Sequence, residues 1–187
     1  DFCNKFKSNS RSIQTGNIVF AQKESKKKNT ILFAVTLKDF RNCQFHGVET
    51  YYEFVNNLNF LDDLSKKNKL NIVVKIHPRE NRCLNDLKVI FKNLKFSEGS
   101  LENLLEESIA TISFSSTVIE DSLNSKVPVI LFDQWHRYKH CEAQEDVHSK
   151  NSAVYYVNKK SSLAKCIDTI KNSGNIDFKQ YIFDTKR

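Results

Sequence analysis

Short apolar runs alternate with segments of helical character along most of this chain, and this alternation restricts the fold more than any other feature. The runs are continuous, which is typical of strands buried on both faces, and they cover residues 31–36, 70–76, 109–114, 127–132 and 153–157. The segments between them predict helices over residues 51–67, 83–94, 100–108, 116–125 and 161–171, with a weak strand near Phe96. The pattern therefore predicts an α/β fold, a Rossmann-like and mostly parallel sheet with helices on both faces.

The segments outside this pattern set the expected domain limits. Residues 1–29 are polar, include a lysine run and show no sustained period, so we expect a linker or lead-in there. Residues 30–172 form the expected domain, and residues 173–187 carry enough aromatic side chains to pack back on it as a tail. The chain contains no Met, which suggests a piece of a longer polypeptide whose N-terminal half is missing.

Net charge and cysteine content limit the ligands and the cellular compartment that we expect. The net charge is +7, and much of it lies in lysine clusters, which favours anionic substrates or an anionic membrane surface. Aromatic residues do not interleave with these clusters as a stacking platform for nucleic acid would require, so nucleic acid is not predicted. The five cysteines are widely spaced and no apolar stretch approaches the ~20 residues of a membrane span. We expect a cytoplasmic protein, for which peripheral contact with the inner face of the membrane is compatible with the charge.

A histidine-proline pair follows the strand predicted over residues 70–76. Strand alternation places Lys75 and His77 on the same side, and Pro78 bars the strand from continuing as a central one. A histidine at this position can donate to a phosphoryl oxygen or assist a leaving group. The alternative is an ordinary loop histidine in front of a turn-forming proline.

A second polar signature follows the strand predicted over residues 109–114. Ser115, Ser116 and Thr117 open the next helix, where free backbone N–H groups, the helix dipole and the hydroxyls together suit a phosphate. Glu120 follows about one turn later, where its carboxylate can accept both hydroxyls of a ribose. The alternative is a capping run, because Ser and Thr favour helix starts whatever the function. Since the carboxyl ends of neighbouring parallel strands share one crevice, both signatures are expected to face the same ligand.

Polar residues after the remaining strands are weaker candidates. Thr36 and Lys38 end the first strand and are expected to overhang the same crevice, as donor ligands or as a solvated loop. Trp135 or Tyr138, in the polar stretch after residue 132, either covers a base or packs under a loop. The same stretch leaves open a helix from Glu142.

Metal and cofactor sites have little support in the sequence. Side chains that can bind zinc gather in one stretch, but no second cluster completes four ligands and the stretch is not convincingly helical; they are His136, His140, Cys141, Glu145 and His148. The chain lacks the glycine-rich signatures of dinucleotide-binding folds and of P-loop ATPases. We therefore predict neither a metal nor a cofactor.

Three segments, residues 75–78, 104–120 and 126–130, resemble the C-terminal half of GT-B glycosyltransferases. The likeness is to bacterial surface-polysaccharide enzymes with a histidine-proline motif and a serine motif: sialyl- and polysialyltransferases, capsule Kdo transferases and CDP-glycerol glycerophosphotransferases. Residues 14–17 and the lysines after them also look like the passage between the two halves of such an enzyme. The resemblance covers roughly residues 14–172.

The resemblance implies a nucleotide-sugar donor, CMP- or CDP-linked, and inverting, metal-independent transfer to a glycan or glycolipid acceptor. His77 matches the motif histidine that contacts the donor phosphate, and Ser115 and Ser116 match the serine motif. Glu120 matches the acidic residue that serves the ribose. Two departures are visible: the N-terminal half that supplies the acceptor site and catalytic base is missing, and Lys126 stands where related enzymes often have Gly. The first implies that this fragment binds donor but is inactive alone.

Two other functions stay open at this point. One is a non-catalytic α/β module that binds a nucleotide or phosphate. The other is a UDP-sugar-using enzyme of the same two-domain shape, such as a sugar-nucleotide epimerase. A receiver module is disfavoured, because the acidic cluster it needs after its first strand is replaced by Thr36-Leu37-Lys38-Asp39.

Overall fold

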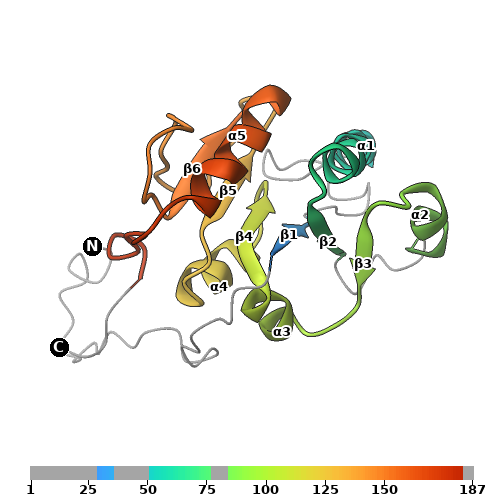
Figure 1. Ribbon diagram of the computed structural model, residues 1–187, viewed down its shortest axis with the longest axis horizontal. Coiled ribbons are helices and arrows are strands. Elements are labelled where there is room, and N and C mark those ends of the chain that lie inside the picture. The colour runs from blue at the N-terminus through green and yellow to red at the C-terminus, as the bar shows by residue number, and fades with distance from the viewer. Residues whose placement is uncertain (1–28, 36–50, 77–83, 183–187) are drawn as a thin grey trace, which may run out of the picture.

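The computed structural model describes residues 29–35, 51–76 and 84–182 (Figure 1). These residues form a six-stranded, all-parallel sheet with the order β3-β2-β1-β4-β5-β6. The strands are β1 (Thr30–Ala34), β2 (Asn71–Lys75), β3 (Lys95–Ser97), β4 (Ser108–Ser113), β5 (Val129–Phe132) and β6 (Val154–Val157). The predicted Rossmann-like α/β fold is confirmed, and the strand order is that of a doubly wound sheet.

Helices cover both faces of the sheet. They are α1 (Tyr51–Asn68), α2 (Leu84–Ile90), α3 (Leu101–Glu106), α4 (Val118–Asn124) and α5 (Lys160–Lys171). In Figure 1, α1 and α5 lie on one side of the sheet and α3 and α4 on the other. Strand residues divide accordingly: Ile31 and Phe33 of β1 join the core under α1 and α5, whereas Leu32 packs with Leu105 and Val127. All five residues of β1 are buried, which explains why this run is continuously apolar.

Two predicted helices differ from the structure. The helix predicted over residues 83–94 ends at Ile90, because the backbone N–H of Asn93 donates to Asp62 (2.9 Å) in a turn that leads into β3. No helix begins at Glu142. There the backbone N–H of Gln144 donates to the Val154 carbonyl (2.9 Å), and the Gln144 carbonyl accepts from Tyr156 (2.8 Å), so this segment runs alongside β6 instead.

The order of the strands places a topological switch point at the carboxyl ends of β1 and β4. From β1 the chain proceeds to β2 and β3 on one side, and then returns to β4 on the other side of β1. Open α/β sheets bind ligands at such a point. The hydroxyl of Ser113, the last residue of β4, donates to the Ala34 carbonyl at the end of β1 (3.1 Å) and ties the two strands together there.

At the opposite, amino edge, α1 and α4 end in left-handed turns. Lys126 has φ 55° and Lys69 has φ 51°, a conformation that favours glycine. After α4, the N–H of Val127 donates to the Ser122 carbonyl (2.8 Å) and that of Lys126 to the Leu123 carbonyl (2.9 Å), which is a Schellman motif. A glycine at position 126 would adopt this left-handed conformation more readily than the lysine that is present.

The described part of the C-terminal tail lies against the α4 side of the domain. Ile176, Phe178 and Tyr181 pack against the apolar cluster that contains Ile119 of α4 and Val154 of β6. The Tyr181 hydroxyl donates to the Glu142 carbonyl (2.8 Å). Among the described helices, none combines the length and the apolar character needed to cross a membrane.

Candidate functional site

The serine turn, residues 115–117, joins the carboxyl end of β4 to α4. Ser115 and Ser116 are partly exposed and Thr117 is exposed. The Ser116 hydroxyl accepts from the backbone N–H of Val118 (3.3 Å), whereas the Thr117 side chain makes no capping hydrogen bond. Ser116 therefore has a local capping role, and the turn as a whole still presents hydroxyls at the edge of the sheet.

Buried hydroxyls fix α4 against β4. The Ser122 side chain, which is fully buried, lies 2.9 Å from the hydroxyl of Thr111 and also bonds the Val118 carbonyl at 2.6 Å. This contact joins the middle of the helix to the strand beneath it. The helix start, and with it the serine turn, is held in a fixed position relative to β4.

Glu120, in the first turn of α4, is paired with His140 from the segment that follows β5. Their Oε1 and Nε2 atoms are 2.7 Å apart, and the side chains are 52% and 19% exposed, respectively. An ionised carboxylate only accepts hydrogen bonds, so the pair uses the histidine form that carries a proton on Nε2. The other ring nitrogen, Nδ1, is buried and has no hydrogen-bond partner within the described segments.

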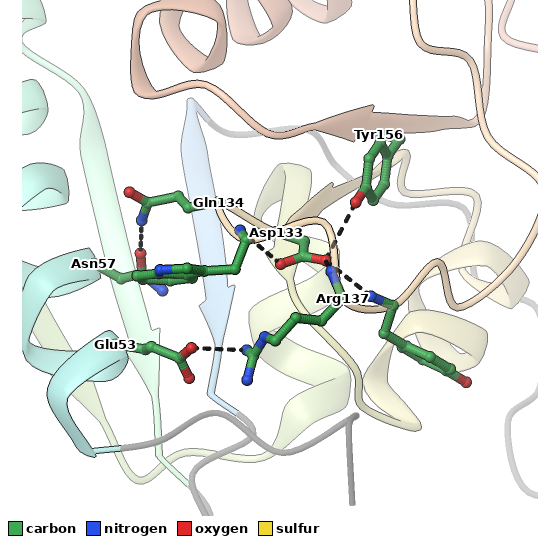
Figure 2. A network of polar contacts seen from close by, with 8 residues as sticks. Glu53, Asn57, Asp133, Gln134, Arg137 and Tyr156 are labelled. Atoms are coloured by element: carbon green, nitrogen blue, oxygen red, sulfur yellow. Dashed lines mark hydrogen bonds and ion pairs between the residues drawn. The ribbon is translucent and has the colours of Figure 1, made fainter.

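Asp133 is a buried carboxylate at the carboxyl end of β5 and organises the loop after that strand (Figure 2). Its Oδ1 accepts from the backbone N–H of Trp135 (3.1 Å). Its Oδ2 accepts from the backbone N–H groups of Arg137 (2.5 Å) and Tyr138 (2.9 Å) and from the Tyr156 hydroxyl (3.2 Å). Burial, followed by the charge of Asp133 and its hydrogen bond, raises the pKa of Tyr156 to about 12. The carboxylate thus holds the loop in a tight turn and fixes the backbone positions of Arg137 and Tyr138.

The first two turns of α1 are tied to the same loop by polar side chains. Glu53 Oε1 lies 3.0 Å from Arg137 Nη2, and Asn57 Oδ1 accepts from Gln134 Nε2 at 2.5 Å (Figure 2). Both α1 residues are buried although they are polar, with 7% and 4% of their surface exposed. Polar groups are buried at this depth when they are hydrogen-bonded, so the two contacts fix α1 against the β5 loop.

The Arg137 guanidinium lies next to the serine turn. Its central carbon is 4.7 Å from the ring centroid of Phe114, the residue that immediately precedes Ser115. The Tyr138 ring meets the same Phe114 ring edge-on, at 6.3 Å. A cation and two aromatic rings therefore accompany the hydroxyls at the carboxyl end of β4; the Phe114 ring is buried, whereas the Tyr138 ring is exposed and can meet a ligand.

Of the residues singled out from the sequence, Ser115, Ser116, Thr117 and Glu120 lie together at one end of α4. Lys75 ends β2, and its Nζ donates to the Gly99 carbonyl in the connection between β3 and α3 (2.7 Å). His77, Pro78, Thr36 and Lys38 lie outside the described residues. The convergence of the histidine-proline pair with the serine turn therefore stays a prediction.

Sequence reasoning gave no role to several polar residues of this site. Asp133 directly follows a buried strand and precedes Trp135, and that position was its only signal. Glu53 and Asn57 had none, because they belong to a helix whose apolar stripe dominates the pattern. Among the described residues, no group of three or more His, Cys, Asp or Glu side chains is placed to hold a metal ion.

Comparison with known proteins supports the fold at the level of architecture. No protein-family model and no curated protein sequence matches the chain. Among solved structures, UDP-GlcNAc 2-epimerase from Methanocaldococcus jannaschii aligns over 79% of this chain and 40% of its own, with 21% identity and a TM-score of 0.50. The same organism's UDP-GlcNAc 2-epimerase in complex with UDP-GlcNAc and UDP aligns over 87% of this chain and 43% of its own, with 18% identity and a TM-score of 0.54.

The present chain thus spans about two fifths of the length of these epimerases. At such identities the likeness shows a fold, a GT-B-like Rossmann half. It does not distinguish among the sialyl-, Kdo- and CDP-glycerol-type enzymes that the sequence resembles.

Proposed function

We propose that this chain is the donor-binding domain of an enzyme that acts on a nucleotide-activated sugar. The observation that carries the proposal is the position of the serine turn and Glu120, at the carboxyl end of β4 beside the switch point of a doubly wound sheet. The structural likeness to an epimerase solved with UDP-GlcNAc and UDP supports it. Under this proposal residues 30–172 bind the donor, and residues 1–29 lead in from an N-terminal half of the same enzyme.

Each candidate residue has a proposed role. Ser115, Ser116 and Thr117 bind the donor phosphates through hydroxyl and backbone N–H groups, and Glu120 accepts the ribose hydroxyls. Arg137 adds positive charge beside them, partly offset by Glu53.

Residues at and after the carboxyl ends of β1 and β2 complete the proposed binding site for the nucleotide-sugar donor. His77 contacts the donor phosphate and assists the leaving group, and Pro78 shapes the turn that presents it. When a phosphate is present, Lys75 Nζ exchanges its hydrogen bond to the Gly99 carbonyl for a contact with the phosphate. Thr36 and Lys38 approach the phosphates from the end of β1.

The sequence resemblance favours a glycosyltransferase of bacterial surface or capsular polysaccharide synthesis. Such an enzyme transfers sugar with inversion and without a metal, from a CMP- or CDP-linked donor to a glycan or glycolipid. Since the acceptor site and the catalytic base belong to the N-terminal half in that family, the present chain binds donor without turnover. A second candidate is a UDP-sugar enzyme such as an epimerase, which the solved structures favour.

Nucleotide binding tests the proposal and separates the two candidates. Melting temperature and calorimetric titration are measured for the 187-residue chain with CMP, CDP, UMP and UDP. A ligand that binds only the folded state at 100 times its Kd adds about 2.7 kcal/mol to the free energy of unfolding, which a melting curve detects. A cytidine preference supports the transferase, and a uridine preference supports the second candidate.

The serine turn is tested with two serine variants, one on each side of α4. Ser116→Ala is expected to weaken nucleotide binding about tenfold, the effect of losing about 1.4 kcal/mol of hydrogen bonding. Ser125→Ala, at the opposite end of α4, is the matched control and is expected to bind like the unmodified chain. The proposal is wrong if none of the four nucleotides binds.

A further inference from the structure

We infer that His140 is a positioning residue that holds the Glu120 carboxylate ready for a ligand with two neighbouring hydroxyls, and that it thereby sets a preference for ribose over deoxyribose. The inference rests on the proposed function, because it concerns the ribose end of the nucleotide. It assigns to His140 a role that neither the sequence resemblance nor the fold implies.

The geometry of the pair carries the inference. Glu120 extends from an exposed position on α4, and 52% of its side chain is accessible, whereas the His140 side chain is 19% exposed. The histidine Nε2 occupies one side of Oε1 at 2.7 Å. A carboxylate offers about four acceptor positions, so one such contact orients the group and leaves acceptors for a ligand.

His140 is itself held in place through the β5 loop. Its ring meets the Tyr138 ring edge-on, with centroids 5.9 Å apart and an interplanar angle of 82°. The backbone of Tyr138 is anchored on Asp133 by a hydrogen bond of 2.9 Å, and its ring also meets Phe114 of the serine-turn region. The buried carboxylate of Asp133 is thus connected, by contacts between successive neighbours, to the exposed carboxylate of Glu120.

Acidic side chains lie near Glu120. Asp121 follows it on α4, and the pKa of Asp121 is raised by burial and then by the charge of Glu120. Glu120 and Glu142 also contribute, after burial, to the raised pKa of the Cys141 thiol. Glu120 therefore has a like-charged neighbour on its own helix, and the hydrogen bond to His140 holds its carboxylate beside the loop.

Preorganisation of this kind affects discrimination between ribose and deoxyribose as well as affinity for the nucleotide. A glutamate that is already oriented loses less rotamer freedom when it binds. It accepts both hydroxyls of a ribose at once, whereas a 2′-deoxyribose leaves one acceptor without its donor. A freely rotating glutamate adapts to either sugar, so losing His140 should weaken ribonucleotide binding more than deoxyribonucleotide binding.

The test compares the affinities of UDP and CDP with those of their 2′-deoxy counterparts, for the full chain and four variants. His140→Phe keeps an aromatic ring but removes the donor, and His140→Gln keeps an N–H donor at the same number of bonds from the backbone. Glu120→Gln removes the charge of the acceptor, and His148→Phe, at an exposed histidine in the same segment, is the matched control. Melting temperatures measured without nucleotide check that each variant folds.

We expect the unmodified chain to prefer the ribonucleotide by about tenfold, as the loss of one hydrogen bond to a charged group implies. His140→Phe should reduce the preference to about threefold or less, His140→Gln should restore most of it, and His148→Phe should leave it unchanged. Glu120→Gln should also reduce it.

Several results would overturn the inference while leaving nucleotide binding, and with it the proposed function, intact. One is that His140→Phe or Glu120→Gln keeps the full preference for the ribonucleotide. Another is that His140→Phe and His140→Gln lose this preference equally. The third is that the unmodified chain shows no such preference. If only a monophosphate binds, the same comparison is made with CMP or UMP and its 2′-deoxy counterpart. If none of the four nucleotides binds, the proposed function fails and the inference fails with it.

Discussion

The two edges of the sheet use polar side chains in different ways. At the amino edge, polar side chains form hydrogen bonds with backbone groups at the ends of helices. The Ser65 hydroxyl, for example, bonds the carbonyls of Leu70 (2.7 Å) and Asn93 (2.9 Å) where α1 ends. At the carboxyl edge, charged side chains hold one another or shape a loop, as in the Glu53–Arg137 and Glu120–His140 pairs. The side chain–backbone bonds of the amino edge stabilise helix ends. The side-chain pairs of the carboxyl edge orient charged groups, which is what a binding site requires.

Asp133→Asn should produce the largest effect, and it tests whether the carboxyl edge depends on one buried charge. The substitution keeps one acceptor oxygen but removes the charge that four donors share, so we expect a loss of roughly 3 kcal/mol in the free energy of unfolding. Urea unfolding measures the change. A loss below 1 kcal/mol would contradict the view that this carboxylate organises the loop.

A matched pair on α1 compares the two edges directly. Glu53→Gln weakens a largely buried ion pair at the carboxyl edge, and a loss of roughly 2 kcal/mol is expected, since Arg137 keeps some access to water. Asp62→Asn alters an exposed contact to Asn93 at the amino edge and should cost less than 1 kcal/mol. Equal losses in the two variants, measured by the same urea titration, would show that the edges do not differ in this respect.

Glycine at position 126 should stabilise the protein. Lys126 has φ 55°, and relief of this left-handed conformation exceeds the added entropy of glycine in the unfolded chain, for a net gain of about 1 kcal/mol. Thermal unfolding of Lys126→Gly measures the gain, and nucleotide affinity should be unchanged because the turn lies at the amino edge. A destabilised variant would mean that the lysine side chain makes a contribution that its backbone conformation does not reveal.

A pH dependence at Tyr156 is the last expected effect. Its pKa is raised to about 12 from an ordinary value near 10, so the hydroxyl favours the folded state fully below pH 10, and this contribution is lost as the pH rises toward 12. The difference in unfolding free energy between the unmodified chain and Tyr156→Phe should therefore decrease between pH 10 and 12. A difference that stays constant over this interval would argue against the coupling of Tyr156 to Asp133.

The fold was predictable from the sequence because its signals are local. The continuous apolar run of β1 follows from burial on both faces, and the helix predicted from residue 100 begins at Leu101, where the Ser100 hydroxyl accepts from the N–H of Asn103 (3.3 Å). The end of α2 was predicted wrongly. Its last apolar residues, Phe91 and Leu94, point into the core from a turn, and the contact with Asp62 that makes this turn joins residues distant in sequence.

The candidate site was predictable only where it is continuous in sequence. Ser115, Ser116 and Glu120 belong to one strand–helix junction, so a sequence motif identifies them. The pairing of Glu120 with His140, and of Glu53 with Arg137, joins elements separated by a strand or more, and only the folded chain brings them together. Within the histidine-rich stretch, for which no metal was predicted, His140 has a carboxylate partner, Glu120.

The segment around Gln144 has a consequence for the behaviour of the protein in concentrated solution. A six-stranded parallel sheet has two outer strands, and an outer strand with unpaired backbone groups can recruit a second molecule. Here β3 is only three residues long, and Gln144 already bonds Val154 and Tyr156 along the outer side of β6. β6 is thus partly paired by its own chain and β3 offers a template of only three residues, and a net charge of +7 adds repulsion between copies.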